Sequence, residues 1–326
     1  MRRKRVVAVG GGTGLYTLLR GLKNYDLDLT AVVTMTDDGG STGELRDEYG
    51  VLPPGDVRRC IVALSESSEM MKELFQYRFV RGSMAGHSFG NLFITALKEL
   101  TDSDEAAIEQ ASKLLKVKGK VLPVTLDNRK LKARLEDGQV IQGETNIDLP
   151  KHDGHLKIDK VFLDKPATPN SIVVKALERA DMIILGPGDL YTSVIPNLLV
   201  KNISQAINKS RAKKVYICNL MTKFGETNGF FLHDFIEEIR HYLHAEPDYV
   251  VWSPVRLSKK LQAKYLRQQA QPVRLSKAKL SNLKKTRIIE ASVVSKADLV
   301  RHDSNRLAKL TWSLVNLNNH IKFIDG

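Results

Sequence analysis

Short apolar runs alternate with helical patterns along most of the chain. The first run covers residues 6–9, and leucines then recur at positions 15, 18, 19 and 22, which is the spacing of one helix face. Further apolar runs predict strands at residues 29–35, 182–185, 214–218, 249–252 and 287–289. Helical patterns stand between many of them, at residues 56–64, 70–75, 92–100, 105–115, 171–179, 198–207 and 231–243, and again after Asp303. This alternation predicts an α/β fold with an open, mainly parallel sheet.

The pattern changes between residues 120 and 165. The runs there are short and alternate with polar residues, and Glu136-Asp137-Gly138 is a hairpin turn signal between two of them. We therefore expect a small antiparallel β insertion at 120–165 within a single α/β domain spanning residues 1–326. No internal repeat or low-complexity linker divides the chain.

A glycine-rich turn joins the first strand to the first helix. Its residues are Gly10, Gly11, Gly12, Thr13 and Gly14. Such a turn presents backbone N–H groups and a helix N-terminus to a phosphate, and the threonine adds a hydroxyl donor. The dinucleotide pattern G-x-G-x-x-G fails at its last position, where leucine stands, and this disfavours an NAD-dependent oxidoreductase. A tight strand–helix turn without a ligand is the alternative.

Polar, mostly glycine-containing loops also follow later strands or precede helices. Because the carboxyl ends of strands in an open parallel sheet border one crevice, these loops predict a shared site for a phosphorylated ligand. The candidate residues are Asp37, Asp38, Gly40, Ser41, Ser88, Asn91, Gly186, Gly188, Asp189, Tyr191, Thr192, Ser193, Thr222 and Lys223.

Several of these residues also have an ordinary structural interpretation. Asp37 and Asp38 suit ribose hydroxyls or Mg²⁺, which prefers oxygen ligands, but an aspartate here also caps turns. Ser88 and Asn91 flank a helix start, where either can act only as a cap. Tyr191 either stacks on a base or packs in the core.

Catalytic signatures are absent from the sequence. It contains no G-x-S-x-G elbow, no G-x-x-x-x-G-K-[ST] phosphate loop and no H-E-x-x-H. The loops therefore predict a binding crevice better than a reaction, and we lean towards a protein that is not an enzyme.

Charge and cysteine content narrow the cellular setting. The formal net charge is +13, and much of the excess lies at residues 253–290, where Glu290 is the only acid. We favour a solvated basic face over nucleic-acid binding, because no motif for the latter accompanies it.

Cys60 and Cys218 both lie in apolar runs, which predicts buried thiols and a reducing compartment. The basic first residues precede too few apolar residues for a secretory signal, and no run is long enough to span a membrane, so we expect a cytoplasmic protein.

Six motifs occur in an order that resembles one known family. They are V-G-G-G-T-G-L, T-D-D-G-G-S-T-G, P-P-G-D-V-R-R, G-H-S-F-G-N-L, G-P-G-D-L-Y-T-S-V-I-P-N-L-L and N-L-M-T-K-F-G-E-T-N-G-F. Over residues 6–308 the chain resembles the gluconeogenesis factor family (YvcK type), which is related to 2-phospho-L-lactate transferase (CofD). The resemblance implies a doubly wound, Rossmann-like fold with a small insertion, and binding of a UDP-sugar such as UDP-N-acetylglucosamine. It also implies a role in carbon-source use and in cell-shape or cell-wall control, rather than a settled catalytic activity.

The resemblance also assigns roles near the C-terminus and marks three departures. Arg301, in L-V-R-H-D, would be a cation for a diphosphate, and Tyr265 would stack on uracil. Asp189 stands where the family usually has serine, Lys223 where glutamine is usual, and Phe224 where proline is usual. An added acid near a diphosphate is unfavourable, so Asp189 either points away or helps to hold a cation.

Our main hypothesis is a cytoplasmic regulator that binds a nucleotide sugar. The alternative is a CofD-like, Mg²⁺-dependent transferase acting on a phosphorylated substrate, with Asp37 and Asp38 as the metal ligands. A protein partner that responds to the bound state and a homo-oligomer both stay open.

Overall fold

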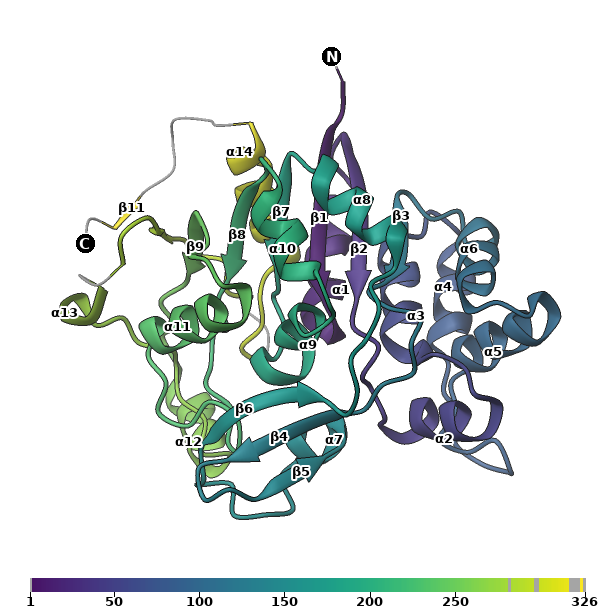
Figure 1. Cartoon of the computed structure of the whole chain (residues 1–326), viewed down its shortest axis with the longest axis horizontal. Helices are drawn as coiled ribbons and strands as arrows, with labels where there is room; N and C mark the ends of the chain where they lie inside the picture. Colours follow the sequence, from purple (N-terminus) through teal and green to yellow (C-terminus); the bar gives the residue numbers. More distant parts are fainter. Residues whose placement is uncertain (1, 281–282, 296–298, 317–322, 325–326) are drawn as a thin grey trace.

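A central sheet, flanked by helices, organises the chain. The computed structural model describes residues 2–280, 283–295, 299–316 and 323–324. The strands of the sheet follow the order β11-β10-β9-β8-β7-β1-β2-β3 (Figure 1). β11 is antiparallel to β10, and the remaining neighbours are parallel. The strands are β1 (Lys4–Gly10), β2 (Leu27–Val33), β3 (Lys120–Pro123), β7 (Met182–Leu185), β8 (Lys213–Ile217), β9 (Tyr249–Trp252), β10 (Arg287–Glu290) and β11 (Phe323–Ile324).

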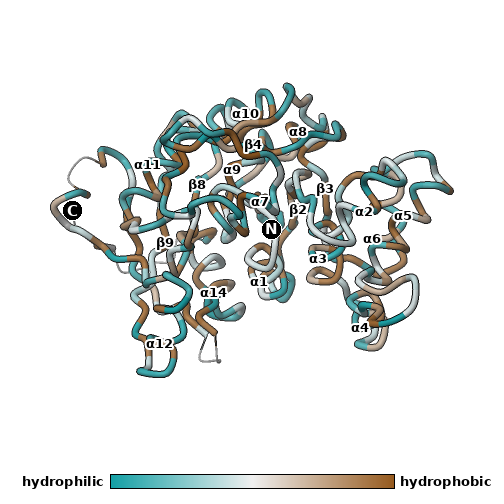
Figure 2. Tube along the Cα trace, turned by 90° about the horizontal axis from the view of Figure 1, so that it is seen from below, coloured by the Kyte–Doolittle hydropathy of each residue, from teal (hydrophilic) through white to brown (hydrophobic). Residues whose placement is uncertain are grey.

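Helices cover both faces of this sheet (Figures 1 and 2). One face carries α8 (Ser171–Arg179), α9 (Ile195–Leu198), α10 (Ile203–Lys209) and α11 (Leu232–Leu243). The other carries α1 (Gly12–Leu22), α3 (Pro54–Leu64) and α14 (Ser304–Val315). Beyond the β3 edge lie α2 (Gly40–Tyr49), α4 (Glu69–Gln76), α5 (Phe89–Thr101) and α6 (Asp104–Leu114). The central strands are buried on both sides, which explains their continuous apolar runs. The predicted doubly wound α/β fold is confirmed.

The order of the strands reverses between β1 and β7. The chain first runs outwards from β1 through β2 to β3, and later runs outwards in the other direction from β7 to β10. β1 and β7 are nonetheless neighbours, with Ala8 paired to Ile184. Doubly wound sheets bind ligands outside the carboxyl ends of the strands at such a reversal. The loops that begin at Gly10 and Gly186 therefore meet where a ligand site is expected.

The small antiparallel sheet lies beside the carboxyl edge of the main sheet (Figure 1). Its order is β5-β4-β6, formed by β4 (Leu131–Leu135), β5 (Val140–Gln142) and β6 (Ile158–Leu163), and it also holds the short helix α7 (Glu144–Asp148). The turn 136–138 joins β4 to β5 as predicted. The stretch 120–123 is different, because it forms β3 and pairs with β2 in the main sheet. The inserted sheet thus begins after β3.

Three other local predictions change. Residues 198–207 do not form one helix, since a π-helical turn, η1 (Leu190–Val194), leads into α9, and α10 follows separately. The loop predicted at 36–43 turns into α2 at Gly40. The helix expected to start at Asp56 begins at Pro54, so Asp56 is not its N-cap. Cys60 and Cys218 are buried free thiols, as predicted.

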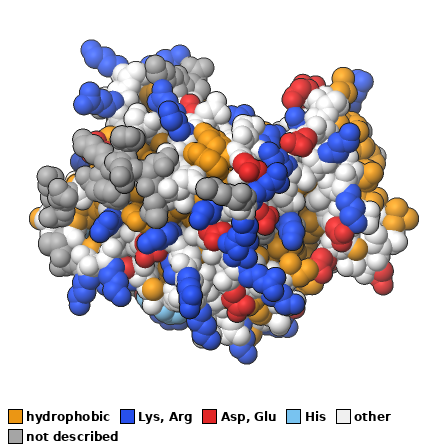
Figure 3. Space-filling view, turned by 90° about the horizontal axis from the view of Figure 1, so that it is seen from above, with side chains coloured by type: hydrophobic (Ala, Val, Ile, Leu, Met, Phe, Trp, Pro, Cys, Tyr) orange, Lys and Arg blue, Asp and Glu red, His pale blue; other side chains and the backbone are white. Residues whose placement is uncertain are grey.

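The remaining segments are α12 (Lys259–Arg267) and α13 (Lys277–Leu280), in the basic stretch before β10. The lysine and arginine side chains described in this stretch are exposed. Figure 3 shows the molecule from above, where lysine and arginine side chains are spread over the surface with acidic side chains among them. Within the described residues, no helix has both the length and the apolar character needed to cross a bilayer.

Candidate functional site

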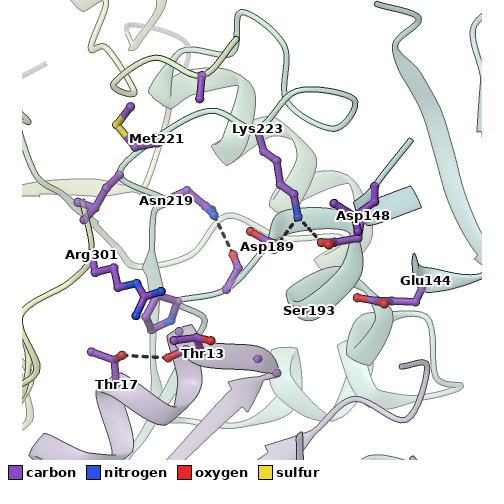
Figure 4. Close-up of a pocket in the computed structure, with 18 of the residues that line it drawn as sticks. Thr13, Thr17, Glu144, Asp148, Asp189, Ser193, Asn219, Met221, Lys223 and Arg301 are labelled. Atoms are coloured by element: carbon purple, nitrogen blue, oxygen red, sulfur yellow. Dashed lines mark hydrogen bonds and ion pairs between the residues drawn. The ribbon is translucent and has the colours of Figure 1, made fainter. Parts of the chain in front are cut away.

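A cavity of about 920 Å³ lies outside the carboxyl ends of β1, β7 and β8, and we call it the crevice. The loops after these strands form its floor. The helix α7 contributes Glu144 and Asp148 from the inserted sheet, and the segments 265–270 and 300–302 also line it. Figure 4 shows these side chains pointing into a common space. The strand reversal therefore coincides with the cavity.

The turn 10–14 forms one wall, and its glycines are required mainly by the protein's own packing. A Cβ on Gly14 would lie 2.4 Å from the carbonyl oxygen of Pro187, and a Cβ on Gly11 would lie 2.5 Å from Oδ2 of Asp56. Gly12 has φ +62°, which favours glycine, and it lines the crevice. The absence of side chains at Gly11 and Gly14 thus allows two strand-end loops and an acid to close around the N-terminus of α1.

Asp56 lies at that helix N-terminus. Its Oδ2 accepts a hydrogen bond of 2.7 Å from the amide of Gly12, and Arg59 approaches Oδ1 at 3.3 Å. Burial raises the pKa of Asp56, while Arg59 and the Gly12 amide oppose the shift. A carboxylate already satisfies one amide of the first turn, so a ligand phosphate would use the neighbouring Thr13 and Gly14 amides.

Asp37 and Asp38 point to different partners. Asp37 lines the crevice, and its Oδ1 accepts from the amide of Gly39. Both oxygens of Asp38 accept from α7, from the amides of Thr145 at 2.9 Å and Glu144 at 3.2 Å. Each Asp38 oxygen keeps a second lone pair, but Asp38, unlike Asp37, is not part of the crevice lining. Asp38 instead attaches the inserted sheet to the loop after β2.

The acids of this wall raise one another's pKa values. Burial and then the charge of Asp56 raise the pKa of Asp37 to about 6. Burial, followed by the charges of Asp37 and Asp148, raises the pKa of Glu144 to about 9. Carboxyl groups with raised pKa values in a cleft are typical of binding and catalytic sites.

Lys223 stands at the centre of a second acidic group. Its Nζ donates to Asp148 Oδ1, lies 2.9 Å from Asp189 Oδ2, and lies 3.0 Å from Glu226 Oε1. Burial alone would lower the pKa of Lys223, but the three carboxylates together raise it above its ordinary value. Burial raises the pKa of Glu226 to about 8, against the opposing charge of Lys223. Asp189 therefore pairs with a cation that the protein itself supplies, the ammonium of Lys223.

The C-terminal segments supply the other wall. Tyr265 is buried, lines the crevice, and its hydroxyl accepts a hydrogen bond of 2.9 Å from the amide of Val300. This bond holds the segment of the exposed Arg301 beside α12. Thr222 also lines the crevice, and its hydroxyl accepts from the amide of Gln271. Tyr265 and Arg301, the two candidates that the resemblance implies, thus line the same wall of the crevice.

The structure divides the predicted site residues into two groups. Those that line the crevice are Gly11, Gly12, Thr13, Gly14, Asp37, Gly40, Gly188, Asp189, Ser193, Thr222, Lys223, Tyr265 and Arg301. Those outside its lining are Gly10, Asp38, Ser41, Ser88, Asn91, Gly186, Tyr191 and Thr192. Tyr191 and Thr192 are buried, and the ring of Tyr191 packs in the core.

Ser41, Arg58, His87, Ser88 and Asn91 form a separate polar group, which we call the α5 cluster. Ser88 is the N-cap of α5 and accepts from the amide of Asn91. The side chain of Asn91 accepts from Arg58 Nε at 2.9 Å and donates to Ser41 Oγ at 3.3 Å. His87 Nδ1 lies 3.0 Å from that hydroxyl, and its Nε2 is 3.1 Å from Glu44. These side chains satisfy one another beside the crevice.

Sequence analysis missed several crevice residues. Asp56 was assigned to a helix cap, and no role was given to Arg59, Glu144, Asp148 or Asn219, all of which line the crevice. The signal for two of them was available, because Glu144 and Asp148 are four residues apart and share a face of a short helix. Asn219 lies two residues after the end of β8 and donates to the carbonyl of Gly188 at 2.9 Å.

The donor sets differ in their fit to a divalent cation. Asp37, Asp56 and Glu144 offer carboxylate oxygens in the crevice, which suits Mg²⁺. One oxygen each from Asp148, Asp189 and Glu226 lie within 4.8 Å of one another. An ammonium already stands among these three. Among the described residues, only the second set brings three oxygens within reach of one ion, so Asp37, Asp56 and Glu144 would have to move closer together to hold Mg²⁺.

Comparison with known proteins agrees with this architecture. A family described as "2-phospho-L-lactate transferase CofD" matches residues 6–294. The chain belongs to the CofD family. Its relatives are gluconeogenesis factors, so the resemblance noted in the sequence is confirmed.

Two gluconeogenesis factors match this chain over nearly their whole length. The Bacillus subtilis protein named "Gluconeogenesis factor" is 39% identical over 321 residues, which cover 96% of this chain and 99% of that protein. The Halalkalibacterium halodurans protein of the same name is 41% identical and covers 95% and 96%, respectively. The crystal structure of a UPF0052 family member from Bacillus halodurans superimposes with a TM-score of 0.90 at 40% identity, covering 96% of this chain and 99% of that one.

Proposed function

We propose that this CofD-family chain binds a nucleotide sugar in the crevice and acts as a regulator of carbon-source use and of cell shape or cell wall. The main observation is that one cavity, at the strand reversal, brings together the first turn of α1, an exposed arginine and an aromatic ring. These are the groups that a diphosphate and a base require. One amide of that turn is already bonded to Asp56. The regulatory role rests on the resemblance to gluconeogenesis factors.

The diphosphate would lie between the first turn of α1 and Arg301. The amides of Thr13 and Gly14 lie at the positive end of the helix dipole, and both residues line the crevice. Figure 4 shows the guanidinium of Arg301 on the same side as Thr13 and Thr17, away from Lys223. A charge-assisted, two-point contact from this guanidinium suits a phosphate.

A second candidate is a CofD-like, Mg²⁺-dependent transferase. The observation in its favour is the set of crevice acids with raised pKa values, Asp37 and Glu144, next to Asp56. These residues would hold Mg²⁺, which would offset the charge of a phosphorylated substrate. The metal dependence of binding distinguishes this proposal from simple nucleotide-sugar binding.

Isothermal titration tests the proposal directly. UDP-N-acetylglucosamine is titrated into the full chain twice, once with Mg²⁺ and once with EDTA. The Mg²⁺ concentration is about 5 mM, enough to saturate a weak carboxylate site. We expect saturable binding under both conditions. The absence of heat at millimolar ligand, with folded protein, contradicts the proposal. Binding only with Mg²⁺, followed by turnover of the ligand, would favour the transferase.

A further inference from the structure

The ammonium of Lys223 takes the place that a metal ion would have in a carboxylate site. Asp148, Asp189 and Glu226 approach it from three sides, and each offers one oxygen to its Nζ. Two of the N–H donors of the ammonium form hydrogen bonds, to Asp148 and Asp189, and Glu226 adds an ion pair at 3.0 Å. Lys223 is therefore a resident counter-ion, held in place by the acids that surround it.

One side of this group around Lys223 is buried in the protein, and the other side faces the crevice. Glu226 lies behind, with its side chain 1% exposed and its Oε2 without a hydrogen-bond partner among the described residues. Asp148 and Asp189 lie in front, with side chains 29% and 41% exposed, and both line the crevice. The open carboxylate oxygens therefore face any ligand in the cavity.

The two ends of the crevice differ in charge. Figure 4 shows Lys223, Asp148, Asp189 and Glu144 on one side, and Arg301, Thr13 and Thr17 on the other. On the Lys223 side, Asp148 and Asp189 outnumber the one ammonium, whereas at the other end Arg59 and Arg301 balance Asp37 and Asp56. A diphosphate on the Lys223 side would therefore be repelled. The acidic side suits a neutral group that donates hydrogen bonds instead.

A polyhydroxylated ring has this chemistry. Its hydroxyl hydrogens donate to carboxylate oxygens, and one carboxylate accepts from two neighbouring hydroxyls. We infer that Asp148, Asp189 and Lys223 form the subsite for the sugar of the ligand, and that the Asp189–Lys223 pair sets which sugar is accepted. This inference rests on the proposed function, because it places one end of the same ligand.

The pairing of Asp189 with Lys223 supports a role in selectivity. The two positions lie 34 residues apart in the chain, yet their charges meet at 2.9 Å. The acid and the base thus compensate each other, and they change the surface that the crevice offers to a ligand.

The test compares the variants Asp189→Ser, Lys223→Gln and the double variant with the unaltered chain. Each is titrated with UDP, UDP-glucose and UDP-N-acetylglucosamine. We expect the Kd of UDP to stay within about twofold throughout, because its diphosphate lies at the other end. Lys223→Gln should weaken both UDP-sugars by about tenfold, because it removes the charge that holds Asp148 and Asp189 in place. Asp189→Ser should change the ratio of their Kd values, and the double variant should regain most of the affinity lost in Lys223→Gln.

Two outcomes overturn the inference while the proposed function survives. If UDP and the UDP-sugars weaken in parallel, the diphosphate lies at the Lys223 wall. If neither changes, the sugar lies elsewhere. If the unaltered chain binds none of the three ligands, the proposed function itself fails. Arg134→Gln is the matched control, because it removes an exposed ion pair with Asp159 on the inserted sheet without touching the crevice. Thermal unfolding of each variant reports on its folding.

Discussion

The crevice and the α5 cluster are built from similar loops, yet they have different tasks. In the crevice, the groups around Gly11–Gly14, Asp37 and Arg301 border open space. In the α5 cluster, Ser41, Ser88 and Asn91 bond to one another and to Arg58. A polar, glycine-containing loop at a helix start is thus no measure of ligand contact by itself. What separates the two groups is whether their side chains border open space, because Asp37, Thr222 and Tyr265 in the crevice also have partners within the protein.

The largest effect that we expect comes from filling the closest approach between the crevice loops. Gly14→Ala would place a Cβ 2.4 Å from the Pro187 carbonyl oxygen and force two strand-end loops apart. The free energy of unfolding in urea should fall by about 3 kcal/mol. Gly138→Ala is the control, because Gly138 has φ +89° but nothing near its Cβ position, so it should cost only about 1 kcal/mol. Equal losses in the free energy of unfolding of the two variants would show that the contact between Gly14 and Pro187 does not determine the cost.

The α5 cluster should respond in stability and not in binding. Asn91→Ala removes the acceptor of the buried Arg58 guanidinium and the donor to Ser41. We expect unfolding in urea to become easier by about 2 kcal/mol. Ser88→Ala removes only a helix cap and should cost about 1 kcal/mol. UDP-sugar affinity should stay unchanged in both variants, and a specific tenfold loss in affinity would move this cluster into the site.

The crevice should respond in the opposite way. Arg301→Ala should weaken UDP and UDP-N-acetylglucosamine alike by about tenfold or more, because it removes a charged contact to the shared diphosphate. The midpoint of thermal unfolding should change little, since Arg301 is exposed. Arg267→Ala, on the exposed face of α12, is the control. Unchanged titration curves for Arg301→Ala would place the diphosphate elsewhere.

The acidic wall should make stability depend on pH. The pKa of Asp37 is raised to about 6 and that of Glu144 to about 9, so both bind protons more tightly in the folded than in the unfolded chain. Their contribution is present at low pH and is lost as pH rises through these values. Urea midpoints should therefore fall from about pH 4, where both groups titrate in the unfolded chain, to about pH 9, with Asp37 contributing only below about pH 6. Glu144→Gln should flatten this fall, and an identical slope in the variant would contradict the assigned titration.

The smallest effect concerns the attachment of the inserted sheet. Asp38→Asn keeps an acceptor for only one of the amides of Glu144 and Thr145, turns its NH2 group towards the other, and removes the charge from the start of α7. We expect a loss of about 0.5–1 kcal/mol in urea unfolding. Binding of UDP-N-acetylglucosamine with EDTA should be unaffected. A loss of Mg²⁺-dependent binding in this variant alone would show that Asp38 is a metal ligand.

Most of the fold could be predicted because its signals are local. The apolar runs at 6–9 and 182–185 are buried on both faces, so the composition of each run identifies a central strand. The helix pattern at 231–243 places apolar residues on the buried face of α11. The stretch 120–123 gave no such signal, since its pairing with β2 depends on residues about ninety positions earlier.

The site was predicted only where the residue type itself implies an exposed loop. Asp56 looks like a helix cap from its neighbours, and its hydrogen bond to Gly12 spans 44 residues. Ser88 and Asn91 look like ligand contacts from their loop, but their partners are Arg58 and Ser41. Whether a polar side chain faces a cavity or another side chain depends on long-range packing, and spacing along the chain does not report it.

A crystal structure of the full chain with UDP-N-acetylglucosamine tests the central claim most directly. The account predicts the diphosphate between the Thr13 and Gly14 amides and Arg301, with the sugar against Asp148, Asp189 and Lys223. A ligand outside the crevice would contradict the proposed function. A diphosphate seated beside Lys223 would keep the crevice as the site and reverse the orientation inferred from its charges.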